Sequence, residues 1–183
     1  MEKYIALLRG INVGGKNKIA MPELKLAFED IGFSDVVTYI NSGNVIFSCE
    51  IKDRYELVRK IESIISEKFR LKIPVAVLTT KELSDAFKNA PDWWNTGNKE
   101  IYNNTIFVIS PTSVEEVLAE IGEAKPEYEK IASYGNVIFW SATLKTFSKS
   151  RWSKIANSSV NNNVTIRNAN TVKKLLQLAE NKQ

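Results

Sequence analysis

The segment from Arg9 to Ala20 combines residue types that could hold an anion. It contains three glycines and three cations but no acidic residue. Glycine lets a backbone approach a ligand closely and turn successive N–H groups toward it, while Arg and Lys supply positive charge. The segment therefore favours an anion-binding loop, and a glycine-rich loop with a purely structural role stays open as the alternative. The candidate ligand-binding residues of this loop are Arg9, Asn12, Gly14, Gly15, Lys16, Asn17 and Lys18.

Part of this loop approaches the phosphate-binding motif G-x-x-x-x-G-K-[ST]. Gly10, Gly15 and Lys16 match the motif, but Asn17 stands where the motif needs a hydroxyl group to hold Mg²⁺. The next helix is expected to begin near Pro22, which is several residues too late, because the phosphate loop runs directly into its helix. These mismatches favour a looser anion-binding loop over a true nucleotide-phosphate loop.

Two further polar clusters stand at the ends of predicted strands. The first is a predicted hairpin turn, whose geometry explains most of the polarity of its residues. The second joins the last predicted strand to the last predicted helix, where Asn170 or Thr171 is expected to be the N-cap. Its Arg167 is expected to pair with an anion or with an acidic residue. The candidate ligand-binding residues of the two clusters are Asn41, Ser42, Asn44, Arg167, Asn168 and Asn170.

The composition excludes several catalytic and metal-binding chemistries. The 183 residues include no His and a single Cys, Cys49. Without His, the chain cannot use His-based acid–base catalysis, a Ser-His-Asp or Cys-His arrangement, or a Cys/His zinc site. A single Cys also cannot form an internal disulfide. A Mg²⁺ ion held by carboxylates stays open as an alternative, but no cluster of Asp and Glu has the spacing of its ligands, so we expect neither a metal nor a cofactor.

The formal net charge of +4 is unevenly distributed along the chain. From Lys145 onward, eight basic residues stand against one acid, Glu180. Such a segment attracts nucleic acid or another polyanion, or forms an ordinary solvated surface. The apolar run from Tyr4 to Leu8 is too short for a signal peptide or a membrane span. Together with the unpaired cysteine, this run predicts a cytoplasmic protein without a membrane partner.

Hydrophobic periodicity predicts the element order β-α-β-β-α-β twice along the chain. The capping pattern of a polar residue followed three positions later by Glu marks three helix starts, at Asp53, Thr79 and Ser113. The expected strands span residues 3–8, 36–40, 45–48, 74–78, 105–109, 129–132, 137–140 and 164–167. The expected helices span residues 22–31, 53–69, 79–89, 113–121, 151–156 and 171–179.

Two local sequence matches indicate an internal duplication. The five residues from Gly43 to Phe47 are identical to those from Gly135 to Phe139, and Asp30-Ile31-Gly32 matches Glu120-Ile121-Gly122. Both matches fall at equivalent places in the expected element order. A βαββαβ unit folds as a four-stranded antiparallel sheet with both helices on one face. The sequence therefore predicts an α+β protein of two tandem ferredoxin-like βαββαβ repeats with mainly antiparallel sheets.

We expect the first repeat, with a trailing helix, at residues 1–92 and the second, with a C-terminal helix, at residues 103–183. Between them, Pro91, Gly97 and several Asn residues interrupt the hydrophobic periodicity. Trp93 and Trp94 lie in this boundary segment and are expected to pack there rather than to bind a ligand.

Three motifs of the chain are typical of one bacterial family. They are L-L-R-G-I-N-V-G-G-K-N from Leu7, S-G-N-V from Ser42 and T-I-R-N-A-N-T-V from Thr165. Over essentially its whole length, the chain resembles the bacterial family catalogued as domain of unknown function 1697. The resemblance implies a duplicated ferredoxin-like architecture and carries no established activity. Ile166 and Ala169 replace a Thr and a Trp of the family's last motif, so any stacking contact of that Trp is lost here.

Three hypotheses about function follow. The first is a binding module for nucleic acid or a phosphorylated ligand, supported by the basic loop and by Tyr134–Trp140, which is similar to the aromatic third strand of RNA-recognition domains. The second is a metal-independent enzyme that acts on a small anionic metabolite at a cleft between the repeats, with Arg9, Lys16 and Arg167 orienting the substrate. The third is a structural or protein-interaction module. Aromatic side chains exposed on a sheet face would favour the first hypothesis, because bases could stack on them.

Overall fold

The protein divides into two compact units, each built around one sheet. The structure, a computed structural model, describes residues 1–181, so Lys182 of the basic C-terminal segment lies outside the described residues. Unit 1 comprises Met1–Ser84 together with the segment from Lys174 onward, and unit 2 comprises Asp85–Lys173. The chain crosses from unit 1 to unit 2 within helix α3 (Thr80–Lys88) and returns within helix α5 (Ala169–Glu180).

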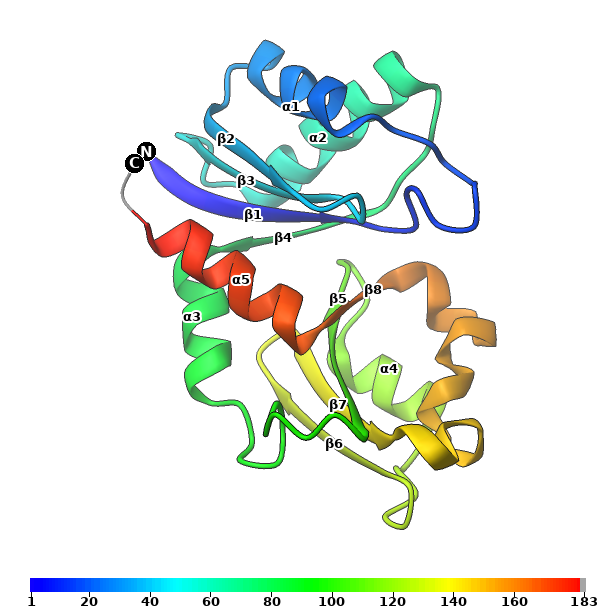
Figure 1. Ribbon diagram of the computed structural model, residues 1–183. Coiled ribbons are helices and arrows are strands. Elements are labelled where there is room, and N and C mark those ends of the chain that lie inside the picture. The colour runs from blue at the N-terminus through cyan, green and yellow to red at the C-terminus, as the bar shows by residue number, and fades with distance from the viewer. Residues whose placement is uncertain (182–183) are drawn as a thin grey trace. The chain divides into compact units, whose positions relative to one another are not determined.

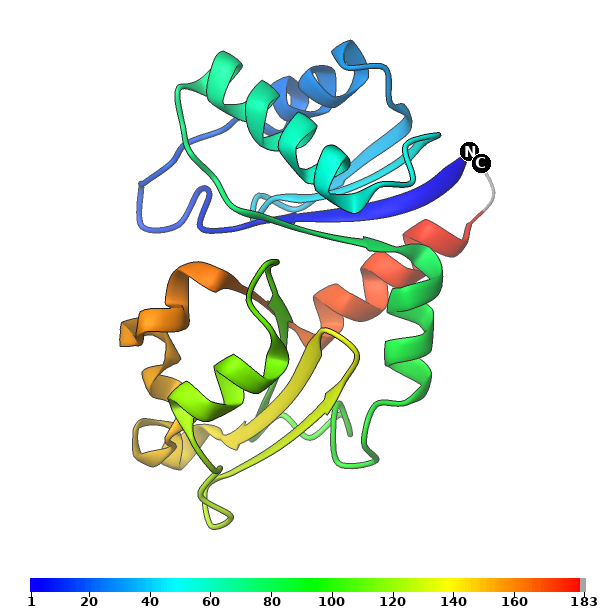
Figure 2. The same ribbon diagram turned by 180° about the vertical axis from the view of Figure 1, so that it is seen from behind.

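Unit 1 has the predicted βαββαβ order, and its sheet is fully antiparallel with the strand order β2-β3-β1-β4. Helices α1 and α2 cover one face of this sheet (Figures 1 and 2). Between the helices and the sheet lies a core that includes Phe28, Phe47 and Ile61. The elements are β1 (Glu2–Leu8), α1 (Met21–Asp30), β2 (Ser34–Tyr39), β3 (Asn44–Cys49), α2 (Arg54–Phe69) and β4 (Val75–Thr79).

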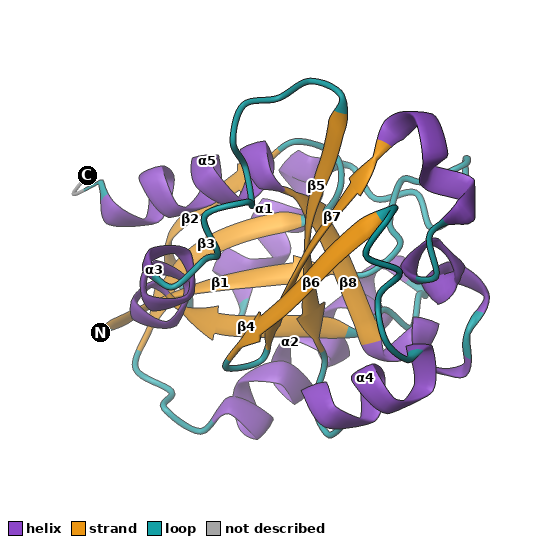
Figure 3. Ribbon diagram, turned by 90° about the horizontal axis from the view of Figure 1, so that it is seen from below, coloured by secondary structure: helices purple, strands orange, loops and turns teal. Residues whose placement is uncertain are grey.

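Unit 2 repeats the sheet of unit 1 with the equivalent strand order β6-β7-β5-β8, again fully antiparallel (Figure 3). Its core packs Ile106, Trp140 and Trp152 between the sheet and the elements on one of its faces. The elements are β5 (Ile101–Val108), α4 (Val114–Ile121), β6 (Glu129–Tyr134), β7 (Val137–Thr143), the 3₁₀ helices Leu144–Lys149, Trp152–Asn157 and Ser159–Asn163, and β8 (Val164–Asn168). The two sheets confirm the predicted fold class of tandem βαββαβ-like units.

Local capping interactions explain where the helices begin. The Asp53 carboxylate accepts hydrogen bonds from the N–H groups of Tyr55 and Glu56, at 2.8 and 3.1 Å. Ser113 and Glu116 form a reciprocal capping box at the start of α4. Because a helix leaves its first N–H groups without internal partners, such side chains fix its first turn. The helix starts expected from these capping patterns are therefore confirmed.

Unit 2 departs from the expected elements in two places. Strand β5 begins at Ile101 rather than at residue 105, because its polar first residues pair with the end of β7 in the register Asn103↔Ser141. The helix expected at residues 151–156 is instead one of three consecutive 3₁₀ helices. These short helices stand where unit 1 has the long helix α2. Within residues 1–181, none of the helices combines the length and apolar character needed to cross a membrane.

Candidate functional site

The segment Arg9–Ala20, which we call the glycine loop, connects β1 to α1 and has an unusual backbone. Gly14 and Gly15 follow one another with φ angles of 57° and 75°. Side chains with a Cβ atom rarely adopt this left-handed region, so two consecutive glycines allow a turn that other residues would strain. Within residues 1–181, no acceptor is hydrogen-bonded to the N–H group of either glycine. Both N–H groups are therefore free to bind a ligand.

Asn12 holds the glycine loop in one conformation. Its Nδ2 donates to the carbonyl oxygen of Ile19 at 2.9 Å, and its Oδ1 accepts from the Ile19 N–H at 2.9 Å. The same Nδ2 donates to the Asn41 carbonyl oxygen at 2.9 Å, which ties the loop to the hairpin turn between β2 and β3. Asn17 adds a hydrogen bond from its Nδ2 to the Gly10 carbonyl oxygen at 3.0 Å. The side chains of Asn12 and Asn17 thus stabilise the conformation of the loop backbone.

The cations of the loop differ in their exposure. Lys16 and Lys18 are exposed, and within residues 1–181 neither forms an ion pair. The Lys16 N–H donates to the Val13 carbonyl oxygen at 3.0 Å, which fixes the backbone from which its side chain extends. Arg9 is half-buried, and its N–H donates to the Pro74 carbonyl oxygen at 3.0 Å. Lys16 and Lys18 therefore supply the accessible positive charge of the loop.

The glycine loop is not a nucleotide-phosphate loop. Helix α1 begins at Met21, so Lys16 lies outside its first turn, and the residue before the helix, Ala20, makes no side-chain capping bond. In a phosphate loop the lysine lies where the helix begins, and the helix N-terminus faces the phosphates. The late helix start expected from the sequence is therefore confirmed, and it separates this loop from a true nucleotide-phosphate loop.

The hairpin turn that Asn12 contacts is mostly explained by its own geometry. Asn44 is completely buried, and its Nδ2 donates to the Tyr39 carbonyl oxygen and to Ser42 Oγ, each at 2.9 Å. Asn41 is exposed and accepts the hydrogen bond from Asn12 through its carbonyl oxygen. The structure therefore brings the turn and the glycine loop together, as two neighbouring parts of one surface of unit 1.

The remaining candidate residues belong to unit 2. Arg167 is 7% exposed, and its guanidinium group donates to Thr165 Oγ1 at 2.8 Å and to the Ile166 carbonyl oxygen at 3.0 Å. Burial lowers the pKa of Arg167 to about 10, so the group still carries its charge at neutral pH. Asn168 Oδ1 accepts the Thr171 N–H at 2.8 Å and caps α5. The N-cap expected at Asn170 or Thr171 is wrong by at least two residues, and Asn170 is exposed inside the helix.

The aromatic third strand of unit 2 does not offer its rings to solvent. Phe139 and Trp140 are 2% and 3% exposed. The Phe139 ring packs against Trp94, with 5.1 Å between the ring centroids, and the Trp140 ring packs against Phe147 at 5.5 Å. RNA-recognition sheets stack bases on rings that remain accessible. Tyr134, at the end of β6, is 41% exposed, so the similarity of Tyr134–Trp140 to such a strand leaves one exposed ring rather than a stacking strand.

A buried carboxylate in unit 2 was not singled out by the sequence. Glu129 is 3% exposed, and its oxygens accept four N–H groups. The donors are the backbone N–H groups of Lys125, Arg151 and Trp152 and the Nε1–H of Trp140, at 3.1, 2.7, 3.1 and 3.2 Å. These donors occupy the carboxylate, so Glu129 orders the chain around it rather than serving as an acid or base. Within residues 1–181, no group of three or more acidic or Cys residues could hold a metal ion.

Known proteins resemble the chain at the level of both structure and sequence. A solved structure described as the conserved bacterial protein SP0830 from Streptococcus pneumoniae has a TM-score of 0.87 and 29% sequence identity, over 98% of this chain and 99% of that one. No curated protein matches the chain. Residues 1–139 match the family described as "Protein of unknown function (DUF1697)". This match spans well over half of the 183 residues, and the chain belongs to that family.

Proposed function

We propose that the protein binds a phosphate-bearing ligand through the glycine loop of unit 1. The observation that carries this proposal is the combination of exposed Lys16 and Lys18 with the unbonded N–H groups of Gly14 and Gly15. Phosphate oxygens accept hydrogen bonds from backbone N–H groups and from lysine amines, and such charge-assisted bonds are stronger than neutral ones. No acidic residue of the loop opposes the charge of an incoming anion.

The fixed conformation of the loop supports the proposal. A flexible loop would lose conformational entropy when it closes on a ligand, and that loss weakens binding. Here the three hydrogen bonds of Asn12 and the hydrogen bond of Asn17 order the loop before any ligand arrives. Two exposed lysines on an ordered backbone are therefore suited to recognising a compact anion.

The phosphate group, rather than a base, is the proposed target. Base recognition needs accessible aromatic rings, and the rings of Phe139 and Trp140 are buried within unit 2. Within the glycine loop there is no aromatic residue. The proposed ligand is thus a phosphorylated small molecule, with the phosphate backbone of single-stranded RNA as the second source of the same chemistry.

Two binding measurements with matched variants test this proposal. Anisotropy of a labelled single-stranded RNA across a salt series reports on polyphosphate binding, and the melting temperature with and without pyrophosphate reports on a small ligand. Lys16→Ala with Lys18→Ala removes both exposed charges of the loop. The control Lys52→Ala with Arg59→Ala removes two exposed charges elsewhere in unit 1.

Loss of pyrophosphate stabilisation in the loop variant alone would identify a small phosphorylated ligand. For RNA, the loop variant should show weaker binding, and its salt slope should fall by about 0.7 for each lysine removed. Equal effects of the two double variants would indicate nonspecific charge attraction, which contradicts a site at the loop. An absence of any binding to the wild-type protein at low salt also contradicts it.

A further inference from the structure

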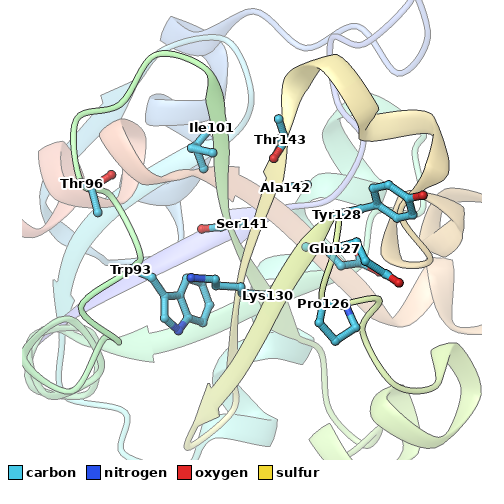
Figure 4. A pocket seen from close by; sticks show the side chains of 11 residues that line it. Trp93, Thr96, Ile101, Pro126, Glu127, Tyr128, Lys130, Ser141, Ala142 and Thr143 are labelled. Carbon is cyan, nitrogen blue, oxygen red and sulfur yellow. The ribbon is translucent and has the colours of Figure 1, made fainter.

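A second site lies entirely within unit 2, on the face of its sheet opposite α4. A pocket of about 250 Å³ opens there between the segment after α3 and the sheet (Figure 4). We call it the Trp93 pocket. The residues of its lining that carry the argument are Trp93, Thr96, Ile101, Lys130, Ser141 and Thr143.

Ser141 and Lys130, which line the Trp93 pocket, belong to a polar row across three strands. Ser141 of β7 lies opposite Asn103 of β5 and opposite Lys130 of β6 in the antiparallel registers. Because directly paired residues of a sheet point to the same face, the three side chains lie side by side. Ser141 is buried, and its hydroxyl donates to Asn103 Oδ1, which leaves the lone pairs of the hydroxyl oxygen available.

One wall of the pocket is a tryptophan whose position is fixed by its neighbour. Trp94 is buried, its Nε1–H donates to the Asn104 carbonyl oxygen at 2.9 Å, and its ring packs on Phe139. Trp93, directly before it, is half-buried and lines the pocket. Within residues 1–181, the Trp93 Nε1–H has no hydrogen-bond partner and its ring has no aromatic partner. A half-buried aromatic ring whose N–H has no partner within residues 1–181 therefore lines the pocket.

The positive charge of the pocket comes from Lys130. Its side chain is exposed and forms no ion pair within the part of the chain that the structure describes. In Figure 4 it extends toward Trp93, whereas Glu127 lies on the other side of the pocket beside Pro126. The nearby carboxylate of Glu129 already accepts four N–H groups, so Lys130 is left to meet an external anion.

We propose that the Trp93 pocket binds a small planar aromatic carboxylate. The ring of such a ligand would stack on Trp93, its carboxylate would meet the Lys130 amine, and the hydroxyls of Ser141 and Thr143 would complete its polar contacts. Ligand pockets usually measure about 300–1,000 Å³, so this smaller pocket suits a ligand of the size of one aromatic ring. The inference concerns another unit and another ligand than the glycine loop and stands independently of it.

The indole N–H signals of the four tryptophans give a direct test. Those of Trp94, Trp140 and Trp152 are hydrogen-bonded inside unit 2, to Asn104, Glu129 and Gly122 respectively. In a nitrogen-labelled sample titrated with benzoate, the Trp93 indole N–H signal should move and saturate, while the other three should stay nearly constant. Trp93→Phe identifies the signal by removing it.

Binding constants of variants, measured by calorimetry with benzoate and its uncharged analogue benzamide, complete the test. Trp93→Ala should weaken benzoate binding about tenfold, which corresponds to about 1.4 kcal/mol, whereas Trp93→Phe should retain most of it. Lys130→Met should abolish the preference for benzoate over benzamide. Lys99→Met removes an exposed lysine outside the pocket lining and should change nothing. Failure of benzoate to bind saturably, or equal effects of Lys99→Met and Lys130→Met, would overturn the proposal.

Discussion

Asn12 and Ile19 form a closed pair of hydrogen bonds across the glycine loop, with the Asn12 amide accepting the Ile19 N–H and donating to the Ile19 carbonyl oxygen, both at 2.9 Å. The Asn12 amide thus makes the same two hydrogen bonds to Ile19 that the backbone of a paired residue makes in an antiparallel sheet. It closes the loop without an extended ladder, so the intervening residues can project into solvent. The ligand-binding capacity proposed for the loop depends on this pair.

Removal of the Asn12 side chain should loosen the loop and lower stability. Asn12→Ala leaves the Ile19 backbone groups without their partner and places an Ala at a φ of 56°. Each unsatisfied buried group costs about 1–3 kcal/mol, so we expect a loss of about 2–3 kcal/mol in the free energy of unfolding. Asn12→Gly removes the same bonds without the backbone strain and should lose less. Urea denaturation measures both, and equal stability of Asn12→Ala and the wild type would show that the pair does not hold the loop.

Gly43 and Gly97 have the same φ angle, so substitutions at the two positions distinguish the cost of backbone strain from the cost of steric overlap. Gly43 and Gly97 both have a φ of 80°, but a Cβ atom at Gly43 would lie 2.8 Å from Leu8 Cβ and 2.9 Å from Ile11 Cδ1. At Gly97 a Cβ atom would meet nothing within 4 Å. Gly97→Ala should therefore cost about 1 kcal/mol from the left-handed backbone alone. Gly43→Ala should cost about 1–3 kcal/mol more because of the overlap. Chemical denaturation of the two variants gives the difference, and equal losses would contradict tight packing of the hairpin turn against the glycine loop.

The Glu129 carboxylate is expected to be essential for the stability of unit 2. Glu129→Gln replaces an acceptor oxygen by an amide that donates, and this amide would face N–H groups that also donate. Because the site is buried and each of the two donors that lose their acceptor costs about 1–3 kcal/mol, we expect a loss of about 2–6 kcal/mol in the free energy of unfolding. Glu127→Gln, at an exposed position two residues away, is the matched control and should be nearly neutral. Similar stabilities of the two variants would show that the four N–H groups find other acceptors.

Much of the architecture could be predicted because it is encoded locally. Asp53 and Ser113 cap their helices through residues at most three positions away, and such spacing is visible in any sequence. The identical pentapeptides at Gly43 and Gly135 begin equivalent strands, β3 and β7. Hydrophobic alternation and short-range capping therefore sufficed for the element order and for the class of fold.

The segment between β7 and β8 could not be predicted in the same way. It is rich in Ser and Asn without a helical period, and three 3₁₀ helices form there. The start of the second of them, Trp152–Asn157, is held by Glu129, which accepts the N–H groups of Arg151 and Trp152 from more than twenty positions earlier in the chain. A contact between residues so distant in sequence leaves no local pattern.

The candidate sites show the same limit. The composition of the glycine loop indicated three candidate cations, of which Lys16 and Lys18 are exposed and Arg9 is half-buried. It could not distinguish Asn12, which orders the loop, from residues free to bind. Trp93 was expected to pack like Trp94, but only Trp94 is buried. The burial of the two adjacent tryptophans differs because Trp94 has a hydrogen-bond partner, Asn104, in strand β5. Such a partner cannot be recognised from the sequence around Trp94.

The pH dependence of stability should contain two opposite contributions from unit 1. Burial raises the pKa of Glu62 above its ordinary 4.5, so the folded state holds this proton more tightly than the unfolded state. Its contribution to stability is therefore present at acidic pH and is lost as the pH rises from 4.5 through the folded-state pKa. Glu62→Gln keeps an acceptor for the Val75 N–H and should be more stable than the wild type at neutral pH but not below pH 4.5.

Glu82 should show the reverse dependence. Burial acts to raise its pKa, but hydrogen bonds from Arg54 and Thr79 and the Arg54 charge outweigh it, and the pKa lies below 4.5. The stability that ionised Glu82 contributes is present above 4.5 and is lost as the pH falls through the folded-state pKa. Glu82→Gln should therefore be less stable than the wild type at neutral pH, with a difference that shrinks in acid. Thermal unfolding of both variants at several pH values measures these differences, and parallel curves for the two would contradict the assigned shifts.

The return of the chain to unit 1 within α5 affects how the protein is made. Leu175 and Ala179 are buried, Glu180 accepts a hydrogen bond from Ser84, and the Lys3 amine donates to the Asn181 carbonyl oxygen. A ribosome adds about 5–20 residues per second, so unit 1 waits roughly 5–20 s for this last segment while the whole of unit 2 is synthesised. During that interval the surface that α5 later covers stays open in the nascent chain. The first unit to be translated is thus the last to be completed.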